Sequence, residues 1–324
     1  MIDTIDSIIL KGSALRREDC IRILDAPDDE LDNLVKAAFV LRKKHKGLMV
    51  SIQILSNAKS GNCSEDCAYC AQSRNADSGI DMYPLISYEK LSATGSLIKE
   101  RGLSRHCIGL SGIRFSDNAI DAFSEQVRKL KAETHTAICC SIGFLTEVQA
   151  RKLKAAGVDR INHNLNTSRA FYPHICTTHT FDERVANIKM LQAIGFEICS
   201  GGIIGLGESN DDVVDMLLEL QSIHPASVPI NFLLPLQGTC LEKADTTHLT
   251  TAYCLKVVCL TRFILPAASI RCAAGREVYF KGHERELLSV VDSLFASGYL
   301  TADGQTIDDT IRLVKESGFE YHIE

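Results

Sequence analysis

The sequence has 324 residues, with 35 Lys and Arg against 41 Asp and Glu, so the formal net charge is −6. With 45% hydrophobic and 6% aromatic residues, this is the balance of a folded globular protein, which argues against a disordered, collagen-like or basic nucleic-acid-binding chain. The length fits two domains, or one α/β barrel of about 250 residues with an appendage.

Residues Met1 to Asp6 are acidic and lack the basic flank and apolar run of a secretory signal. The longest uncharged stretch, 220–241, contains three prolines and several polar residues, which a membrane-spanning helix would tolerate poorly. We therefore expect a cytoplasmic protein with neither a transmembrane segment nor a nucleic-acid partner.

The first predicted element is a helix that begins near Pro27 and ends at Gly47. Acidic residues follow the proline, apolar residues recur at helical spacing from Leu31 to Leu41, and lysines precede the glycine. These are the usual start and stop signals of a helix. We assign residues 1–46 to an N-terminal helical extension.

An alternation of strands and helices follows to the end of the chain. The predicted strands are 48–54, 105–111, 135–142, 158–163, 196–204, 227–233, 268–272 and 290–295, and the helices include 117–133, 146–156, 181–194, 209–222 and 247–265. Eight strands with helical crossovers predict an α/β fold, a (β/α)8 TIM-type barrel, whose site lies at the C-terminal ends of the strands. A doubly wound sheet is the alternative. We expect the barrel to span 47–300, with a C-terminal helical segment, 301–324, completing it.

The sequence contains 13 cysteines, an unusual number for a chain that we expect in a reducing compartment. Such a surplus points to metal ligation or redox chemistry before disulfides. Five of them lie among apolar or helical residues, where a free Cys behaves as a small hydrophobic side chain: Cys20, Cys176, Cys240, Cys254 and Cys259.

Three cysteines, Cys63, Cys67 and Cys70, follow the first predicted strand in a C-x3-C-x2-C arrangement on a loop that contains Gly61. Three thiolates on one short loop can ligate three irons of a 4Fe-4S cluster and leave the fourth iron open for chemistry. The alternative is a structural zinc site. It normally needs four ligands, and no Cys or His follows at the spacing of a zinc knuckle or ribbon.

This loop resembles that of the radical S-adenosylmethionine superfamily, with Tyr69 at the aromatic position before the last cysteine. The resemblance implies that Cys63, Cys67 and Cys70 hold a 4Fe-4S cluster whose open iron chelates S-adenosylmethionine. One electron then gives a 5′-deoxyadenosyl radical. Such a radical can break an unactivated C–H bond, so the reaction must be shielded from water inside the barrel.

Further segments resemble the biotin synthase family within that superfamily, over roughly residues 45 to 300. They are 162–168, 199–208, 227–231 and 271–277. The resemblance implies a sulfurtransferase that inserts sulfur between C6 and C9 of dethiobiotin to form biotin, with the sulfur coming from an auxiliary iron–sulfur cluster. It also implies a homodimer and a reducing electron-transfer protein as partners.

Strand alternation tests for that auxiliary cluster, because inward-facing side chains recur at every second residue. In three predicted strands the apolar neighbours face the helices, which turns Cys107, Cys139 and Cys199 inward and leaves Cys140 outside. The same three positions are the auxiliary-cluster cysteines of the family. The alternative is three buried core cysteines, since Cys is among the most buried residues.

Two adjacent residues are candidates for the fourth ligand of the auxiliary cluster. Alternation turns Arg271 inward, and the family has an arginine ligand there. Cys272 departs from the family, which has an aliphatic residue at that position. If a β-bulge turns the Cys272 side chain into the barrel, a four-iron auxiliary cluster is expected instead of the usual 2Fe-2S type.

The resemblance also assigns the nucleotide and substrate contacts. Glycines after a strand allow a ligand to approach the backbone closely. By resemblance, Gly201, Gly202 and Gly205 border the adenine site. The alternative is that these glycines only form a tight turn. Further predicted contacts are Tyr69 and Asn166 to the nucleotide, Arg184 to the methionine carboxylate, Asn164 to nucleotide and substrate, and Asn231 to the ureido ring of dethiobiotin. The family usually has Asp in place of Asn166.

Some residues near these motifs are given no catalytic role, and two other functions are alternatives to the one above. Five histidines lie near these motifs and are expected to be structural: His106, His135, His163, His174 and His179. Another enzyme of the superfamily, such as a hydrogenase maturase or a tyrosine lyase, would not explain three inward cysteines together with Arg271. A non-catalytic iron–sulfur carrier or sensor would need the thiol loop but no nucleotide pocket.

Overall fold

The computed structural model describes residues 15–301 and 304–321. The first 14 residues of the predicted N-terminal extension lie outside the described residues. None of the described helices is both long and apolar enough to span a bilayer.

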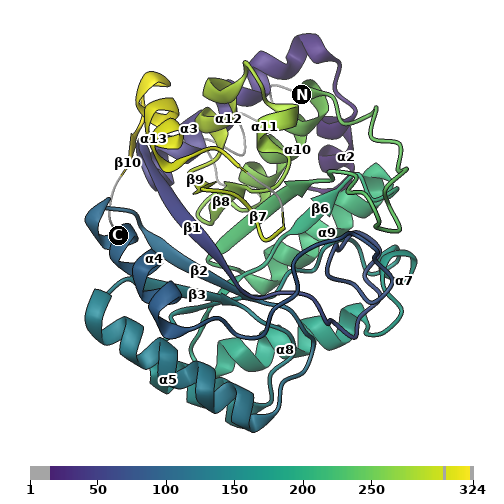
Figure 1. Cartoon of the computed structure of the whole chain (residues 1–324). Coiled ribbons are helices and arrows are strands. Elements are labelled where there is room, and N and C mark those ends of the chain that lie inside the picture. The colour runs from purple at the N-terminus through teal and green to yellow at the C-terminus, as the bar shows by residue number, and fades with distance from the viewer. Residues whose placement is uncertain (1–14, 302–303, 322–324) are drawn as a thin grey trace.

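A parallel barrel forms the centre of the molecule (Figure 1). Its strands are β1 (Met49–Lys59), β2 (Arg105–Leu110), β3 (Ala137–Ser141), β4 (Arg160–Asn162), β5 (Glu197–Cys199), β6 (Gly202–Ile204), β7 (Ser227–Phe232), β8 (Ser269–Cys272) and β9 (Ser293–Ala296). The strands pair in chain order except that β5 pairs with β7 and not with β6, and β9 pairs with β1, which closes the barrel. This closure confirms the predicted (β/α)8 barrel, because the alternative doubly wound sheet would leave both edges open.

The predicted strand 196–204 is wrong in one respect, since it consists of two short strands. β5 pairs with β4 and β7, whereas β6 pairs with β7 only. Between them, Gly201 approaches β7 so closely that a Cβ atom would lie 1.9 Å from the carbonyl oxygen of Pro229. The break therefore comes from a close backbone contact that hydrophobic periodicity does not record.

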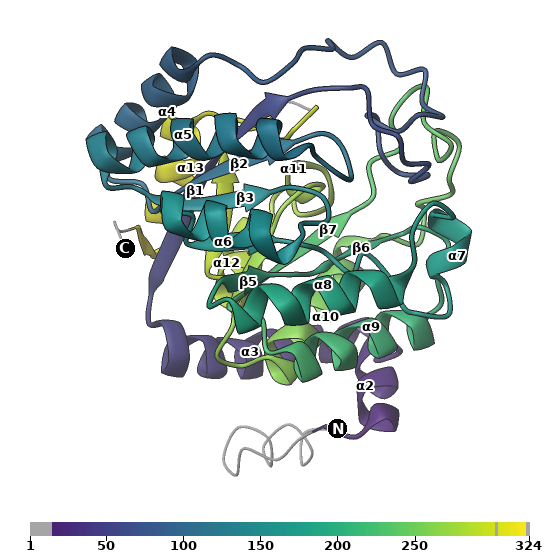
Figure 2. The same cartoon turned by 90° about the horizontal axis from the view of Figure 1, so that it is seen from below.

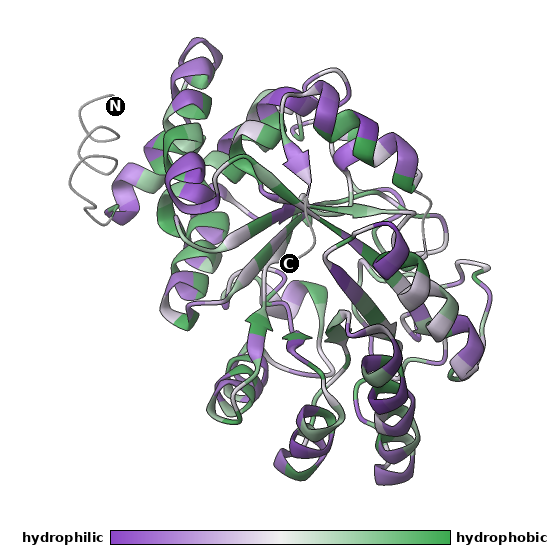
Figure 3. Ribbon diagram, turned by 90° about the vertical axis from the view of Figure 1, so that its left-hand side faces the viewer, coloured by the Kyte–Doolittle hydropathy of each residue, from purple (hydrophilic) through white to green (hydrophobic). Residues whose placement is uncertain are grey.

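The helices pack around the strands with hydrophobic sides against them (Figure 3). They are α4 (Tyr88–Glu100), α5 (Asp117–Thr134), α6 (Glu147–Ala156), α7 (Tyr172–Ile175), α8 (Phe181–Ala193), α9 (Asn210–Ile223), α10 (Thr251–Ile264), α11 (Arg276–Tyr279) and α12 (Glu284–Val290). The five crossover helices predicted from the sequence are present within a few residues. α4 was not predicted: it contains Gly95, and its serines and threonines favour a helix weakly.

The N-terminal extension consists of α2 (Arg17–Leu24), a 3-10 turn η1 (Asp28–Glu30) and α3 (Leu31–Lys46). The positive φ of Gly47 ends α3, as predicted. α2 packs against α9 and α10, and α3 packs against α10 and α12, so both lie outside the helical ring (Figure 2). Arg42 fixes α3 to the barrel, because its buried guanidinium donates to the carbonyl oxygens of Met49 and Val291.

The C-terminal segment contains the predicted helix, α13 (Ile307–Glu316), and a strand that was not predicted, β10 (Glu320–Tyr321). β10 pairs with the first residues of β1. The pairing of β1 with β9 already closes the barrel without this segment. The expectation that it completes the barrel is therefore corrected: β9 closes the barrel, and β10 adds two parallel residue pairs at the start of β1.

The buried apolar residues form two clusters. The larger one lies mainly between the strands and the surrounding helices, and it includes Cys140 and Cys272. The smaller one contains Cys107, Cys139, Cys199, Ala273 and Phe295. The alternation predicted for β3 is confirmed, since Cys139 and Cys140 belong to different clusters.

Candidate active site

A cavity of about 410 Å³ lies at the C-terminal ends of the strands. Residues from β1, β2, β3, β4, β6, β7 and β8 line it, together with the loop that follows β1 and with Phe295, Tyr299, Leu300 and Thr301. The loops after parallel strands converge at this end of a barrel, which is the usual place of an active site. The cavity therefore lies where the sequence predicts the site.

The loop after β1 contributes Cys63, Cys67 and Cys70, and all three line the cavity. Internal hydrogen bonds hold the loop: Gln72 Oε1 accepts from the amide of Gly61 at 2.9 Å, and the amide of Arg74 donates to the carbonyl of Glu65 at 2.9 Å. Its outer side contacts the end of α7, where Ala68 N donates to the carbonyl of Ile175. A 4Fe-4S cluster with one open iron fits this donor set, because three thiols share one cavity and the loop offers no fourth.

A hydrogen-bonded group adjoins the loop. Arg184 donates to the hydroxyl of Tyr172 and, at 2.8 Å, to His179 Nε2. His179 Nδ1 lies 2.6 Å from Glu65 Oε2. Both Arg184 and His179 line the cavity, so the predicted carboxylate partner is placed beside the cluster loop.

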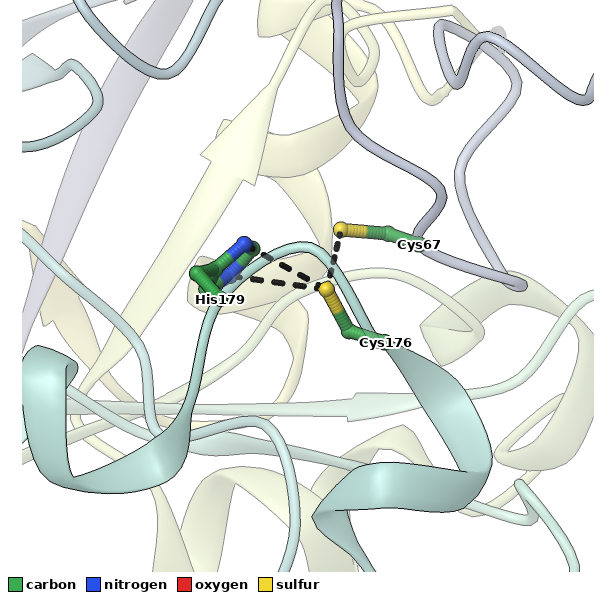
Figure 4. Close-up of side chains that lie close together, drawn as sticks. All are labelled: Cys67, Cys176 and His179. Atoms are coloured by element: carbon green, nitrogen blue, oxygen red, sulfur yellow. Dashed lines mark hydrogen bonds between the residues drawn. The ribbon is translucent and has the colours of Figure 1, made fainter.

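Cys176 also lies beside the loop, with its Sγ 3.8 Å from Cys67 Sγ (Figure 4). A hydrogen bond with Cys67 and another with His179 lower the pKa of Cys176 to about 4. From the sequence, Cys176 and His179 are expected to be structural residues. Their proximity to Cys67 could not be inferred from spacing, because Cys67 and Cys176 lie 109 residues apart in the chain.

The structure brings Cys107, Cys139 and Cys199 together from β2, β3 and β5, at 4%, 2% and 0% exposure. Cys107 is directly opposite Cys139 in the strand register. A hydrogen bond from Cys139 and the charge of Arg271 lower the pKa of Cys107. Asn162 Nδ2 donates to Cys199 Sγ at 3.2 Å, a contact that the sequence analysis did not find.

Arg271 joins these thiols, and its guanidinium is buried. It donates to the hydroxyls of Ser293 at 3.2 Å and Ser227 at 3.3 Å, and its Cζ lies 4.4 Å from the ring centroid of Phe295. Three thiols and one guanidinium from four different strands therefore surround one position in the barrel, which fits an auxiliary iron–sulfur cluster.

Cys272 is not part of this set. The register of β8 runs regularly through it, with Cys272 opposite Ile230 and Leu294, so no bulge re-aims its side chain. It packs in the larger cluster near Cys254, and burial raises the pKa of its thiol to about 12. The geometry therefore contradicts Cys272 as a cluster ligand: adjacent residues of a strand face opposite sides.

The three predicted asparagines all line the cavity. Asn166 has a positive φ of 72° and donates to the hydroxyl of Tyr69 at 2.7 Å. Asn164 Oδ1 accepts from the amide of Gly201 at 3.2 Å. Asn231 is held by backbone groups of two other segments, since Nδ2 donates to Gly202 O at 3.0 Å and Oδ1 accepts from Ala274 N at 3.2 Å. These bonds fix the orientation of each amide at the cavity wall.

The three predicted glycines lie against protein atoms. A Cβ atom on Gly202 would lie 2.1 Å from Met216 Sδ, and one on Gly205 would lie 2.7 Å from a methyl carbon of Leu249. Gly201 lies against Pro229 as described above. None of the three lines the cavity. Close packing and a turn account for these glycines, so their contact with the nucleotide stays a prediction.

Comparison with known proteins agrees with this geometry. The family model for the radical SAM superfamily matches residues 58–220, and that for the Biotin and Thiamin Synthesis associated domain matches residues 229–320. The biotin synthase of Magnetococcus marinus is 39% identical over 310 residues, which are 96% of each chain. The chain belongs to the biotin synthase family. It is thus a radical S-adenosylmethionine enzyme, and both matched regions contribute strands to its single barrel.

Solved structures share the fold of this biotin synthase family member. Methylornithine synthase superposes with a TM-score of 0.85 at 18% identity, over 98% of this chain and 97% of that one. The FeFe-hydrogenase maturase from Carboxydothermus hydrogenoformans gives a TM-score of 0.84 at 18% identity, over 99% and 79%. At this identity the likeness shows a common barrel, whereas the near full-length match to biotin synthase carries the family assignment.

Proposed function

We propose that the protein forms biotin from dethiobiotin and that its two sets of thiols hold two iron–sulfur clusters with different roles. The observation that carries the proposal is their arrangement: Cys63, Cys67 and Cys70 line the cavity from a loop, while Cys107, Cys139, Cys199 and Arg271 lie together among the strands. A radical reaction followed by sulfur insertion needs two such centres near one substrate.

Each centre has its own chemistry. Cys63, Cys67 and Cys70 would hold a 4Fe-4S cluster, which would supply the electron for cleavage of S-adenosylmethionine to methionine and the 5′-deoxyadenosyl radical. Cys107, Cys139 and Cys199 would hold an auxiliary iron–sulfur cluster, which would supply the sulfur. We propose the 2Fe-2S type with Arg271 as the fourth ligand, because Cys272 faces the helices.

The remaining residues bind and orient the two organic molecules. The guanidinium of Arg184 offers paired donors that match a carboxylate, which supports its role at the methionine end of S-adenosylmethionine. Asn166 and Tyr69 are held together and face the same cavity, which supports a role at the ribose. Asn164 and Asn231 offer amide groups suited to a flat urea-like ring. Leu110, Phe232 and Leu234 give the cavity apolar walls that exclude water from the radical.

Three further features rest on family resemblance: a reducing electron-transfer protein as donor, a homodimer, and a cytoplasmic location. The location also agrees with the free state of all 13 cysteines, since a reducing compartment keeps thiols reduced.

An anaerobic assay tests the proposal. Protein reconstituted with iron and sulfide is given S-adenosylmethionine, a low-potential reductant and dethiobiotin, and biotin and 5′-deoxyadenosine are measured. Cys63→Ala should abolish both products, whereas Cys107→Ala should lose biotin and retain nucleoside cleavage. The matched control is Cys259→Ala, a fully buried cysteine of α10 outside both sets, which should make both products. Biotin formation by Cys63→Ala would refute the role of the loop.

A further inference from the structure

Cys67, Cys176 and His179 converge on one buried point although they come from two distant segments (Figure 4). Cys67 lies on the loop after β1, while Cys176 and His179 lie between α7 and α8. Their ligand atoms all fall within 4.8 Å of one another. The two sulfurs are 3.8 Å apart, and Cys176 Sγ is 3.3 Å from Nδ1 and 3.7 Å from Nε2 of His179.

The Cys67–Cys176 and Cys176–His179 separations match edges of a metal tetrahedron, and Cys67 Sγ lies within 4.8 Å of the His179 ligand atom. With Zn–S bonds of about 2.3 Å and a Zn–N bond of about 2.0 Å, tetrahedral geometry places two sulfurs about 3.8 Å apart and a sulfur and a nitrogen about 3.5 Å apart. Two cysteines and one histidine with an open fourth position are also a known ligand set for zinc. The side chains are therefore spaced for one small cation.

The surroundings of His179 support the same interpretation. Metal-binding histidines usually donate their second ring nitrogen to a carboxylate, which fixes the ring. Glu65 Oε2 lies 2.6 Å from His179 Nδ1, and Glu65 is itself held by Thr178 Oγ1 at 2.5 Å and Ser64 Oγ at 3.0 Å. Nε2, which lies 3.7 Å from Cys176 Sγ, is then the ring nitrogen left for the cation. Arg184 donates to Nε2 at 2.8 Å and must release it, but Arg184 keeps its bond to the Tyr172 hydroxyl.

We propose that the cluster-free chain binds one thiophilic divalent cation, Zn²⁺ or Fe²⁺, through Cys67, Cys176 and His179. The two thiols release their protons to solvent, and water takes the fourth position. Because Cys67 cannot serve this cation and a 4Fe-4S cluster together, the two occupants exclude each other. This inference rests on the proposed role of Cys67 as a cluster ligand, and it makes the cation-bound chain an inactive state.

Cobalt titration tests the site. The full-length chain carrying Cys139→Ala, which disrupts the inner thiols, is freed of iron with a chelator and titrated anaerobically with Co²⁺. One equivalent should give thiolate-to-cobalt charge transfer and tetrahedral ligand-field bands. Adding Cys176→Ala or His179→Gln should weaken binding by at least about 100-fold, and Glu65→Gln by about 10- to 100-fold.

The matched control is Cys63→Ala in the same background, which should keep the affinity because Cys63 is outside the site. Loss of binding in that control, or unchanged binding with Cys176→Ala, would overturn the proposal and assign the cation to the three-cysteine loop. Circular dichroism monitors folding of every variant. Cys176→Ser, which keeps the size of the side chain, replaces Cys176→Ala if the alanine variant unfolds.

A separate experiment tests whether zinc and the loop cluster exclude each other, by measuring iron incorporation. Chain loaded with Zn²⁺ should incorporate less than one tenth as much loop-cluster iron as zinc-free chain, and a chelator should restore incorporation. With Cys176→Ala, zinc should no longer block it. Equal iron incorporation with and without zinc contradicts the exclusion. A zinc-free chain that assembles its cluster but makes no biotin would instead count against the proposed function, so the two failures are distinguishable.

Discussion

Arg271 and Cys272 are neighbours in β8 but face opposite sides of the barrel wall. Arg271 lines the cavity with Cys107 and Cys139, whereas Cys272 packs near Cys254 in the larger cluster. We expect Cys272→Ala to keep its auxiliary-cluster iron and to lose about 1 kcal/mol of stability through the small cavity it leaves. Cys139→Ala should lose that iron. Iron and sulfide analysis after anaerobic reconstitution, with thermal unfolding, measures both effects.

His106 gives the protein a predictable dependence on pH. It is fully buried, its Nε2 lies 2.8 Å from Ser56 Oγ, and burial lowers its pKa to about 4. Between pH 6.5 and pH 4 the unfolded chain binds a proton that the folded chain does not, so stability falls as the pH falls. The loss from pH 7 to pH 5 is about 2 kcal/mol for this group.

The variant His106→Gln, which retains a polar partner for Ser56, should reduce that loss. Urea unfolding of cluster-free protein at pH 7 and pH 5 measures the change. Burial also lowers the pKa of His163, so the variant should flatten the pH dependence without removing it. An unchanged difference between the two pH values would show that His106 is protonated in the folded protein.

The break between β5 and β6 depends on Gly201. A Cβ atom there would lie 1.9 Å from Pro229 O, which belongs to β7. Gly201→Ala should therefore force the strands apart and cost roughly 3 kcal/mol. Gly195→Ala is a matched control, since Gly195 has open space around it and a φ of +94°; backbone strain alone should cost about 1–2 kcal/mol there. Urea unfolding should rank the two variants in this order.

The attachment of α3 depends on Arg42. Its guanidinium donates to the carbonyls of Met49, Val291 and Gly47 and lies 4.5 Å from the ring centroid of Phe319. Burial lowers its pKa to about 10, so it stays charged at neutral pH. Arg42→Ala should cost roughly 3 kcal/mol, because it leaves buried carbonyls without donors. The exposed neighbour Lys43 is the control, and Lys43→Ala should stay within about 0.5 kcal/mol in thermal or urea unfolding.

The complete molecule should hold two clusters of different size. Four irons at the loop and two at the inner set give roughly six irons per chain after anaerobic reconstitution. Mössbauer spectra should show one 2Fe-2S and one 4Fe-4S component. Roughly eight irons with two cubane components would contradict the inner site with Arg271 as its fourth ligand.

Much of this architecture could be predicted from residue patterns. The alternation of apolar residues indicated the barrel strands, apart from the split between β5 and β6, and the inward direction of Cys107, Cys139 and Cys199, because a strand has a fixed period of two. The close spacing of Cys63, Cys67 and Cys70 indicated their common site, because a short loop keeps its side chains near one another.

Contacts between distant segments could not be predicted in this way. Cys176 and His179 approach Cys67 only because the α7–α8 connection folds against the loop after β1, and no local pattern encodes that approach. The split at Gly201 depends on Pro229 of the next strand. The β10 pairing joins residues near opposite ends of the sequence, and the two-residue strand is too short to show periodicity.

The pairing of β1 with β9 has a consequence for how the protein is made. During translation Cys63, Cys67 and Cys70 leave the ribosome more than 200 residues before Ser293, the first residue of β9. The nascent chain therefore carries these three thiols for most of its synthesis, before β9 has been made and the barrel can close.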